Sequence, residues 1–196
     1  MTHPFGLERF VGEGRVCTAL GYALIEGDEP TRLGSIGCRP DDLFDLASLT
    51  KPLGTVRAVA QLIEDGALTL EQSVGEWLPE APAQLGAATL ADLLHHRAGL
   101  LAFSERLADR LIGAPERRLR ELRRRVLELP LKHRPGTVVY SDLGFILCAW
   151  ICQRAGMAVD ELAAPQGFLI PSGADLERCI PTGYDPAQMP LKGRVH

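Results

Sequence analysis

The apolar positions in the first part of the chain predict a β-hairpin. Residues 16–26 form an almost continuous apolar run, which is typical of a mostly buried strand. Residues 27–30 have the sequence Gly-Asp-Glu-Pro, which favours a turn. Residues 31–37 are then expected to return as a second strand. The hairpin is assigned to about residues 11–40 of one domain that covers residues 1–196.

After the hairpin, the spacing of apolar residues becomes helical. Apolar side chains recur at intervals of three and four over residues 56–63. Pro52 has no N–H group and is tolerated in a helix only in the first turn, so the helix is expected to begin near residues 48–51. Asp65-Gly66 is typical of its end.

Residues 44–66 therefore form the first helical segment. Residues 67–196 are expected to form a helical region that ends in an irregular segment rich in proline and glycine. The expected helices are a short one within residues 67–79, one over 89–96 with Thr89 as cap and Gly99 at its end, one over 115–129, one over 143–154 ended by Gly156, and short turns at 160–164 and 174–178.

The composition is that of an ordinary globular protein, with 46% hydrophobic and 23% charged residues. The net charge of −4 argues against general binding to nucleic acid or membranes. Arginines in residues 115–129 could form a basic stripe for nucleic acid, but the interspersed glutamates favour a solvated helix face. No apolar run reaches the roughly 18 residues of a transmembrane helix. The N-terminal residues lack a signal-peptide core, so a cytoplasmic location is expected.

The cysteines and histidines do not predict a metal site. The five cysteines have neither the number nor the spacing of a disulfide framework or a zinc site. Cys148 and Cys152 lie four residues apart in an apolar helix, so they are expected to pack in the core as small hydrophobic residues. The histidines show no ligand spacing, and no metal or organic cofactor is expected.

Ser48 and Lys51 form the first candidate catalytic pair. Side chains three residues apart on a helix lie on one face, so the hydroxyl and the amine can touch. A serine needs a neighbouring base to act as a nucleophile. A lysine is that base only if its pKa falls from about 10.4 towards about 7, a change of about 4 kcal/mol. The alternative is that Ser48 is an ordinary N-cap and Lys51 a solvated surface residue.

Tyr140-Ser141-Asp142 is the second candidate, because it follows a Pro-Gly turn and directly precedes a predicted helix. A tyrosine there could share a proton with Lys51 and Ser48, and general acid–base assistance of this kind is worth about 10²–10⁴ in rate. The alternative is that Ser141 or Asp142 caps the helix while Tyr140 packs through its ring.

Four stretches of the chain, in this order, match motifs of a known family. Residues 44–52 (FDLASLTKP) contain S-x-x-K with its usual flanks, and residues 93–100 (LLHHRAGL) are similar to L-L-x-H-x-S-G-L. Residues 135–145, from Pro-Gly to YSDLGF, are similar to P-G-x(3)-Y-S-N-x-G-Y, and residues 193–196 (GRVH) to G-x-V-H-D. The chain thus resembles the serine β-lactamase and penicillin-binding superfamily, in particular the branch of class C β-lactamases, D-alanyl-D-alanine carboxypeptidases and related esterases.

The resemblance implies an α/β (α+β) fold of the β-lactamase/transpeptidase type, an antiparallel sheet with a helical subdomain. It implies that Ser48 is the acylated nucleophile, that its N–H is one oxyanion donor, and that Lys51 and Tyr140 are the proton-transfer pair. The substrate would be a small-molecule ester, amide or β-lactam. His95 and His96 lie in a matched motif and are expected to pack or to form hydrogen bonds.

Asp142 departs from the family pattern, which usually has asparagine at this place. An amide both donates and accepts hydrogen bonds, whereas an ionised carboxylate only accepts. The carboxylate could keep Lys51 protonated and repel a carboxylate on the substrate. Asp142 is therefore the candidate substrate-binding residue, and it favours an esterase-like activity over a β-lactamase.

The third motif of the family, K-T-G or H-x-G on a C-terminal strand, has no match after Tyr140. That strand supplies the second oxyanion donor, and losing one such donor reduces the rate by about 10²–10³. We therefore expect a truncated or split member that lacks the C-terminal strands and is mostly helical as it stands. It is either a serine hydrolase or a non-catalytic remnant, and a second chain that supplies the missing strands would be its partner.

Overall fold

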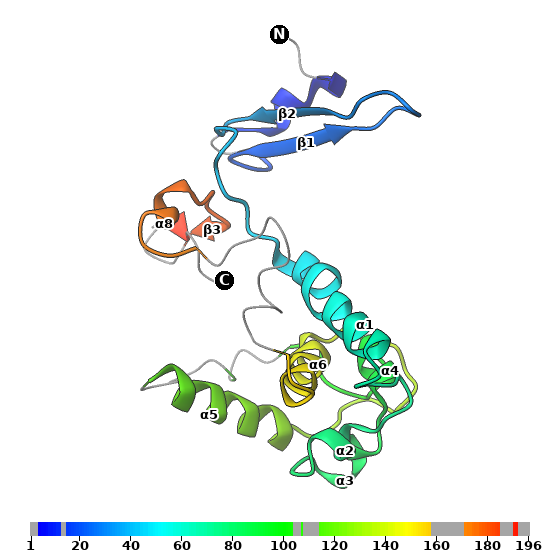
Figure 1. The fold of residues 1–196 in the computed structure, drawn as a ribbon. Helices are drawn as coiled ribbons and strands as arrows, with labels where there is room; N and C mark the ends of the chain where they lie inside the picture. The colour runs from blue at the N-terminus through cyan, green and yellow to red at the C-terminus, as the bar shows by residue number, and fades with distance from the viewer. Residues whose placement is uncertain are drawn as a thin grey trace. The chain divides into compact units, whose positions relative to one another are not determined.

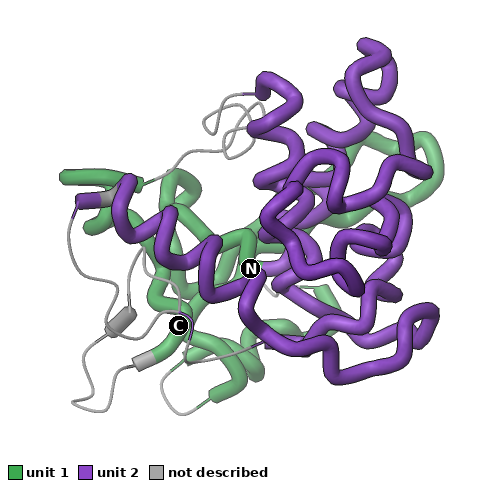
Figure 2. Tube along the Cα trace, turned by 90° about the horizontal axis from the view of Figure 1, so that it is seen from below, with its two compact units in different colours: residues 1–47, 170–196 green, residues 48–169 purple. Residues whose placement is uncertain are grey.

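The chain divides into two compact units, which Figure 2 shows in different colours. The first unit contains residues 1–47 and 170–196, and the second contains residues 48–169. The computed structural model describes residues 4–12, 15–103, 107, 114–157, 171–184 and 190–191.

The first unit contains a two-stranded antiparallel hairpin. β1 (Leu20–Leu24) pairs with β2 (Arg32–Ile36), and Tyr22 lies opposite Gly34. A Cβ added at Gly34 would lie 2.2 Å from the ring of Tyr22, so a larger residue there would have to displace this ring. A short 3-10 helix, η1 (Pro4–Phe10), precedes the hairpin.

The prediction of a mostly buried strand over residues 16–26 is wrong in both length and burial. β1 has five residues, and its side chains alternate between half-buried and exposed. Val16 and Ile25, outside its two ends, are 82% and 75% exposed. A two-stranded ribbon covers little apolar surface, so an apolar run in it is not buried on both faces.

Residues of the C-terminal segment pair with the chain that follows the hairpin. The N–H of Leu43 donates to the carbonyl of Arg178, and the N–H of Ile180 donates to the carbonyl of Leu43, both at 2.8 Å. The helical turn predicted at 174–178 is present as α8 (Asp175–Arg178). The turn predicted at 160–164 lies outside the described residues.

A second small pairing was not predicted. β3 (Gly183–Tyr184) and β4 (Pro190–Leu191) form an antiparallel pair of two residues each. Strands this short carry no alternation of apolar and polar positions, so the sequence gives no periodic signal for them.

The second unit is helical and is arranged around α6 (Asp142–Arg154). A π-helical segment, η3 (Lys51–Val56), continues directly into α1 (Arg57–Glu64), and both contact α6, as does α4 (Leu90–Leu94). Figure 1 shows α6 beside α1 and α4. The helix-rich architecture agrees with the expectation that the chain is mostly helical as it stands. Among the helices of the described residues, none has the length and apolar character of a membrane span.

The apolar side chains of α6 form the centre of the core. Leu143, Leu147 and Ile151 follow one another at helical spacing and are at most 1% exposed. Cys148 and Cys152 are fully buried among them, which confirms their predicted role as core residues. The other helices of this unit are α2 (Val74–Trp77), α3 (Ala83–Gly86) and α5 (Pro115–Glu128).

The end of α4 differs from the prediction. Thr89 caps α4 as expected, in a capping box with Asp92. The helix ends at Leu94 instead of the predicted His96, and His96 takes the left-handed conformation, with φ at 58°. The N–H of Arg97 donates to the carbonyl of Asp92 at 2.7 Å, as in a Schellman motif, in which glycine usually occupies the place of His96.

Gly99 is predicted to be required for the loop after α4. Its φ is +80°, and an added Cβ would lie 2.6 Å from the carbonyl oxygen of His133. Gly99→Ala should lower the free energy of unfolding by about 1–3 kcal/mol, measured by urea denaturation. Gly136→Ala is the matched control, because Gly136 also has a positive φ but nothing within 4 Å of the added Cβ. Equal losses in the two variants would contradict this prediction.

Candidate active site

Ser48 lies at the entrance to the η3–α1 helical segment. The residue before it, Ala47, has a φ of 45°, and the N–H of Ala47 donates to the Oδ1 of Asp45 at 2.8 Å. This Asx turn leads into the 3-10 turn η2 (Ala47–Leu49), and η3 begins at Lys51 with Pro52 in its first turn. The local sequence therefore presents the hydroxyl of Ser48 one turn before the amine of Lys51.

The hydroxyl of Ser48 is held by two side chains. The Nζ of Lys51 donates to the Oγ of Ser48 at 3.3 Å, and the hydroxyl of Tyr140 donates to the same oxygen at 2.8 Å. Tyr140 lies 92 residues further along the chain and directly precedes α6. The structure thus brings together the three residues that the sequence singled out, and Ser48 is not an ordinary N-cap.

Lys51 forms an ion pair with Asp142. The Nζ lies 2.5 Å from the Oδ1 of Asp142, and the lysine side chain is only 15% exposed. The same Nζ lies 4.9 Å from the centre of the Tyr140 ring and 5.8 Å from that of Phe145. Lys51 is therefore not the solvated surface residue of the alternative interpretation.

The protonation of Lys51 differs from what a lysine base requires. Partial burial lowers the pKa of Lys51, but hydrogen bonds to Asp142 and Tyr140 and their negative charges raise it by more. The pKa therefore lies above its ordinary value, and Lys51 is an ammonium at neutral pH. The condition under which Lys51 would be the base, a pKa near about 7, is not met, because the nearest charge is a carboxylate rather than a second cation. This agrees with the expectation that Asp142 keeps Lys51 protonated.

Tyr140 is the titratable group next to Ser48 whose pKa moves in the direction that a base needs. Its pKa lies below the ordinary value, because hydrogen bonds to Lys51 and Ser48 and the ammonium charge stabilise the phenolate. The residue is 50% exposed, so Tyr140 is not enclosed in the core.

Ser141 fixes the backbone between Tyr140 and Asp142. Its side chain is 2% exposed, donates to the carbonyl of Leu101 at 2.6 Å, and accepts the N–H of Gly144 as the N-cap of α6. The proposed cap by Ser141 is therefore correct, while Tyr140 uses its hydroxyl at Ser48 instead of packing alone.

His96 supports the same segment from the end of α4. Its Nδ1 accepts the N–H of Ser141 at 3.0 Å, and its carbonyl accepts the N–H of Val139 at 2.9 Å. The imidazole lies 4.6 Å from the Tyr140 ring and 5.2 Å from the Phe145 ring, between ring centres. The predicted hydrogen-bonding role of His96 is confirmed, but its contact with the candidate site and that of Phe145 were missed. Both lie within matched motifs, which is the signal that could have found them.

The charge state of His96 agrees with this geometry. Burial and then the charge of Lys51 lower the pKa of His96 below its ordinary value. A neutral imidazole keeps the lone pair on Nδ1 that accepts the N–H of Ser141. Among the described residues, no group of three or more His, Cys, Asp or Glu side chains is placed to hold a metal ion.

Comparisons with known proteins give the family of this chain. The sequence model of the family described as Beta-lactamase matches residues 9–163. Esterase EstB of Burkholderia gladioli is 34% identical over 64% of this chain and 37% of its own length. N-acetylmuramyl-L-alanine amidase of Bacillus subtilis (strain 168) is 30% identical over 74% of this chain and 35% of its own length. The chain belongs to the beta-lactamase family.

Solved structures give the same fold. A class C beta lactamase from Rhodobacter sphaeroides is 25% identical, with a TM-score of 0.65, over 92% of this chain and 54% of that protein. D-amino acid amidase from Ochrobactrum anthropi SV3 shares the fold at 21% identity, with a TM-score of 0.62, over 88% of this chain and 54% of that protein. The chain spans about a third of the length of the curated relatives and about half that of the solved structures.

His96 is predicted to make stability depend on pH. The unfolded chain binds a proton at the ordinary pKa of about 6.5, whereas folded His96 resists protonation, so this contribution to stability is lost as pH falls below about 6.5. In His96→Asn the amide oxygen can still accept the Ser141 N–H, and asparagine tolerates a positive φ. As the pH is lowered from ~7.5 to ~5.5, the free energy of unfolding of the wild type should decrease relative to that of the variant. Urea denaturation at each pH measures this difference. Parallel pH curves would contradict the prediction.

Proposed function

We propose that this chain carries the acylation site of a serine hydrolase, with Ser48 as the nucleophile. The observation that carries the proposal is the pair of hydrogen bonds on the Oγ of Ser48, from Tyr140 at 2.8 Å and from Lys51 at 3.3 Å. A nucleophile in contact with a base, and a base oriented by a third group, is the arrangement that covalent catalysis needs.

Tyr140 and Lys51 act as the proton-transfer pair with divided roles. The phenolate form of Tyr140 takes the proton of Ser48 as the Oγ attacks the substrate carbonyl. Lys51 stays an ammonium, held by Asp142, and stabilises the phenolate. When the tetrahedral intermediate collapses, the carbonyl–leaving-group bond breaks and the proton passes from Tyr140 to the leaving group. In the second half of the reaction, Tyr140 takes a proton from water as the water attacks the ester on Ser48. The bond between the carbonyl carbon and the Oγ of Ser48 then breaks, and the proton passes from Tyr140 back to the Oγ.

The oxyanion of the intermediate needs hydrogen-bond donors. Ser48 precedes the η3–α1 segment, whose first N–H groups have no partner within the helix. The N–H of Ser48 is proposed as one oxyanion donor, a type of contact worth about 10²–10³ in rate.

An ester without a negative charge near the scissile bond is the proposed substrate class. The side chain of Asp142 is 41% exposed and lies against Lys51, so its carboxylate faces a substrate bound at Ser48. The related proteins include an esterase and amidases, and esters are the substrates with the better leaving group. A carboxylate on the acyl part of the substrate would be repelled by Asp142.

The alternative is a non-catalytic chain that binds a second chain carrying further strands. It is motivated by the share of the relatives that this chain spans. The labelling experiment below distinguishes the two, because it measures a covalent bond to Ser48 directly.

Ser48 should react with a fluorophosphonate probe. Mass spectrometry of the treated wild type is expected to find the adduct on Ser48, and Ser48→Ala should carry none. Ser172→Ala, which removes an exposed serine of the first unit, is the control and should be labelled as the wild type is. Hydrolysis of p-nitrophenyl acetate should likewise be retained in Ser172→Ala and lost in Ser48→Ala. An adduct that persists in Ser48→Ala, or none in the wild type, would support the non-catalytic alternative.

Asp142 should discriminate against anionic acyl groups. The test compares kcat/KM for p-nitrophenyl acetate and for a p-nitrophenyl ester whose acyl chain ends in a carboxylate. In Asp142→Asn the relative rate with the anionic ester should rise about 3–10-fold, as expected for removing one charge several ångströms away in a solvated site. Asp142→Glu keeps the charge and should keep the preference. An unchanged ratio in Asp142→Asn would show that Asp142 does not face the substrate.

A further inference from the structure

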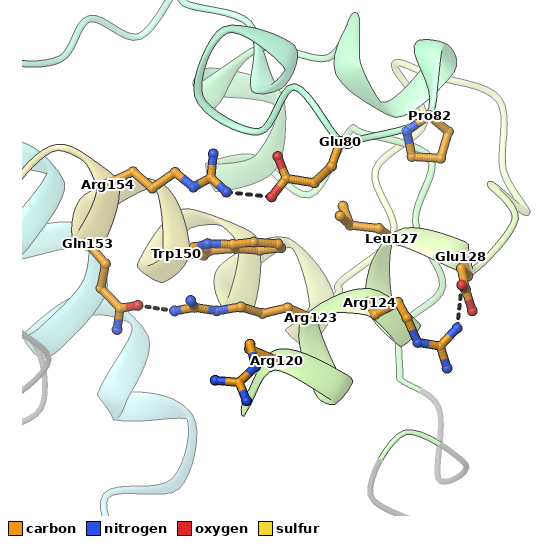
Figure 3. A pocket seen from close by; sticks show the side chains of 10 residues that line it. All are labelled: Glu80, Pro82, Arg120, Arg123, Arg124, Leu127, Glu128, Trp150, Gln153 and Arg154. Carbon is orange, nitrogen blue, oxygen red and sulfur yellow. Dashed lines mark hydrogen bonds and ion pairs between the residues drawn. The ribbon is translucent and has the colours of Figure 1, made fainter. Parts of the chain in front are cut away.

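A cavity of about 670 Å³ lies between α5, the C-terminal half of α6 and the segment before α3. Figure 3 shows side chains from all three of these elements around it. Its volume falls in the range of small-molecule sites. The residues that line it include none of the catalytic candidates, and Trp150 lies eight residues after Asp142 on α6, about 12 Å along the helix.

Trp150 lies between two guanidinium groups in this cavity. The guanidinium carbon of Arg123 lies 4.7 Å from the centre of the indole, and that of Arg154 lies 5.4 Å from it. Figure 3 shows the two arginines on opposite sides of the ring. The indole is 7% exposed, so both cations are held against a rigid, mostly buried surface. These guanidiniums are thus positioned before any ligand binds.

The positive charges of the cavity are only partly balanced. Arg154 donates to the Oε1 of Glu80 at 2.5 Å, and Arg124 is paired with Glu121 and Glu128. The lining contains four arginines and two glutamates, which leaves an excess of two positive charges in a chain whose net charge is −4. The excess is therefore local and does not reflect a basic protein surface.

Arg123 and Arg120 carry the unbalanced charge. Arg123 donates to the side-chain oxygen of Gln153, which is neutral. Arg120 is exposed, and among the described residues its guanidinium has no ion-pair partner. The two arginines lie three residues apart and therefore on the same face of α5. Burial and the charge of Arg154 lower the pKa of Arg123, so an added negative charge there would be favourable.

The cavity also has apolar wall residues. Leu127 and Pro82 line it beside the edge of Trp150, as Figure 3 shows. Such a surface suits the organic part of a ligand, while a free inorganic anion would leave it uncovered.

We propose that this cavity binds a small organic phosphate monoester. Its dianionic phosphate matches the excess of two charges and is held by the guanidiniums of Arg120 and Arg123. Arginine presents paired N–H donors that match phosphate oxygens bidentately, which favours phosphate over a singly charged carboxylate. The organic part lies against Leu127, Pro82 and the edge of Trp150. This binding does not depend on the chemistry proposed at Ser48.

Titration calorimetry of the full chain with phenyl phosphate tests the site. We expect saturable binding with one site and a Kd of about 0.1–1 mM. Benzoate should bind at least about tenfold more weakly, since it carries one charge, and inorganic phosphate should bind more weakly because it lacks the ring. Phenol should not bind measurably. In the Ser48→Ala variant the Kd should be unchanged, which separates this site from the proposed hydrolase.

Arg120→Gln should weaken the binding of phenyl phosphate about tenfold or more. Arg120 is exposed, so this variant should fold, and a thermal melt by circular dichroism checks that it does. Arg118→Gln is the matched control: it removes the same charge from the same helix, but two residues away and therefore on another face. It should change the Kd less than about twofold.

Three results would overturn the proposal. The first is the absence of saturable binding by phenyl phosphate. The second is an equal loss in Arg118→Gln and Arg120→Gln, because it would show diffuse attraction to the charge of α5 instead of a site. The third is binding of benzoate as tight as that of phenyl phosphate, because a singly charged group would then suffice.

Discussion

The buried hydroxyl of Ser141 is the contact on which the candidate site depends. It accepts the N–H of Gly144 as the cap of α6 and donates to the carbonyl of Leu101, while the backbone N–H of Ser141 donates to the Nδ1 of His96. Tyr140 and Asp142 are its two neighbours in sequence. Because Ser141 is fixed from three directions, one neighbour reaches the Oγ of Ser48 and the other reaches the Nζ of Lys51. A buried polar group with all its partners restricts the backbone more than an apolar contact does.

The ion pair between Lys51 and Asp142 decides the electrostatics of the site. A lysine near a carboxylate stays charged, so it cannot take a proton from Ser48. The same charge lowers the pKa of Tyr140, and it lowers that of His96 after burial has its larger effect. In the mechanism that we propose, the proton-accepting role therefore falls to the tyrosine, and the carboxylate of Asp142 faces the proposed substrate.

The helix α6 links this site to the arginine-lined cavity. At its N-terminal end, Tyr140 and Asp142 contact Ser48 and Lys51. Its middle fills the core, and its last turns carry Trp150 and Arg154, which line the cavity. The helix is buried along most of its length, so both groups of side chains are held on one rigid element. Glu80 binds Arg154 and Gln153 binds Arg123, on the two sides of the indole. The guanidiniums that lack a carboxylate partner within the described residues, those of Arg120 and Arg123, both come from α5.

Local features of the sequence were enough to predict much of the second, helical unit. Pro52 set the start of the first helix, Thr89 set the start of α4, and apolar spacing gave α5 and α6 to within about one residue, because these signals act within a turn or two. The ordered motifs also indicated Ser48, Lys51, Tyr140 and Asp142. The burial of the hairpin and the two-residue strands were not predictable, because they depend on pairing across the chain.

What the tertiary structure alone decided is how those residues act on one another. No local rule tells that His96 takes a left-handed conformation at the end of α4, or that its ring lies against Tyr140. The sequence left two directions open for the pKa of Lys51, a fall that a base requires or a rise caused by Asp142. The direction depends on which charge lies nearest in space, and the pKa rises. The sequence determined which chemical groups are present and which helices carry them. Their distances, burial and charge states come from contacts between segments that lie far apart along the chain.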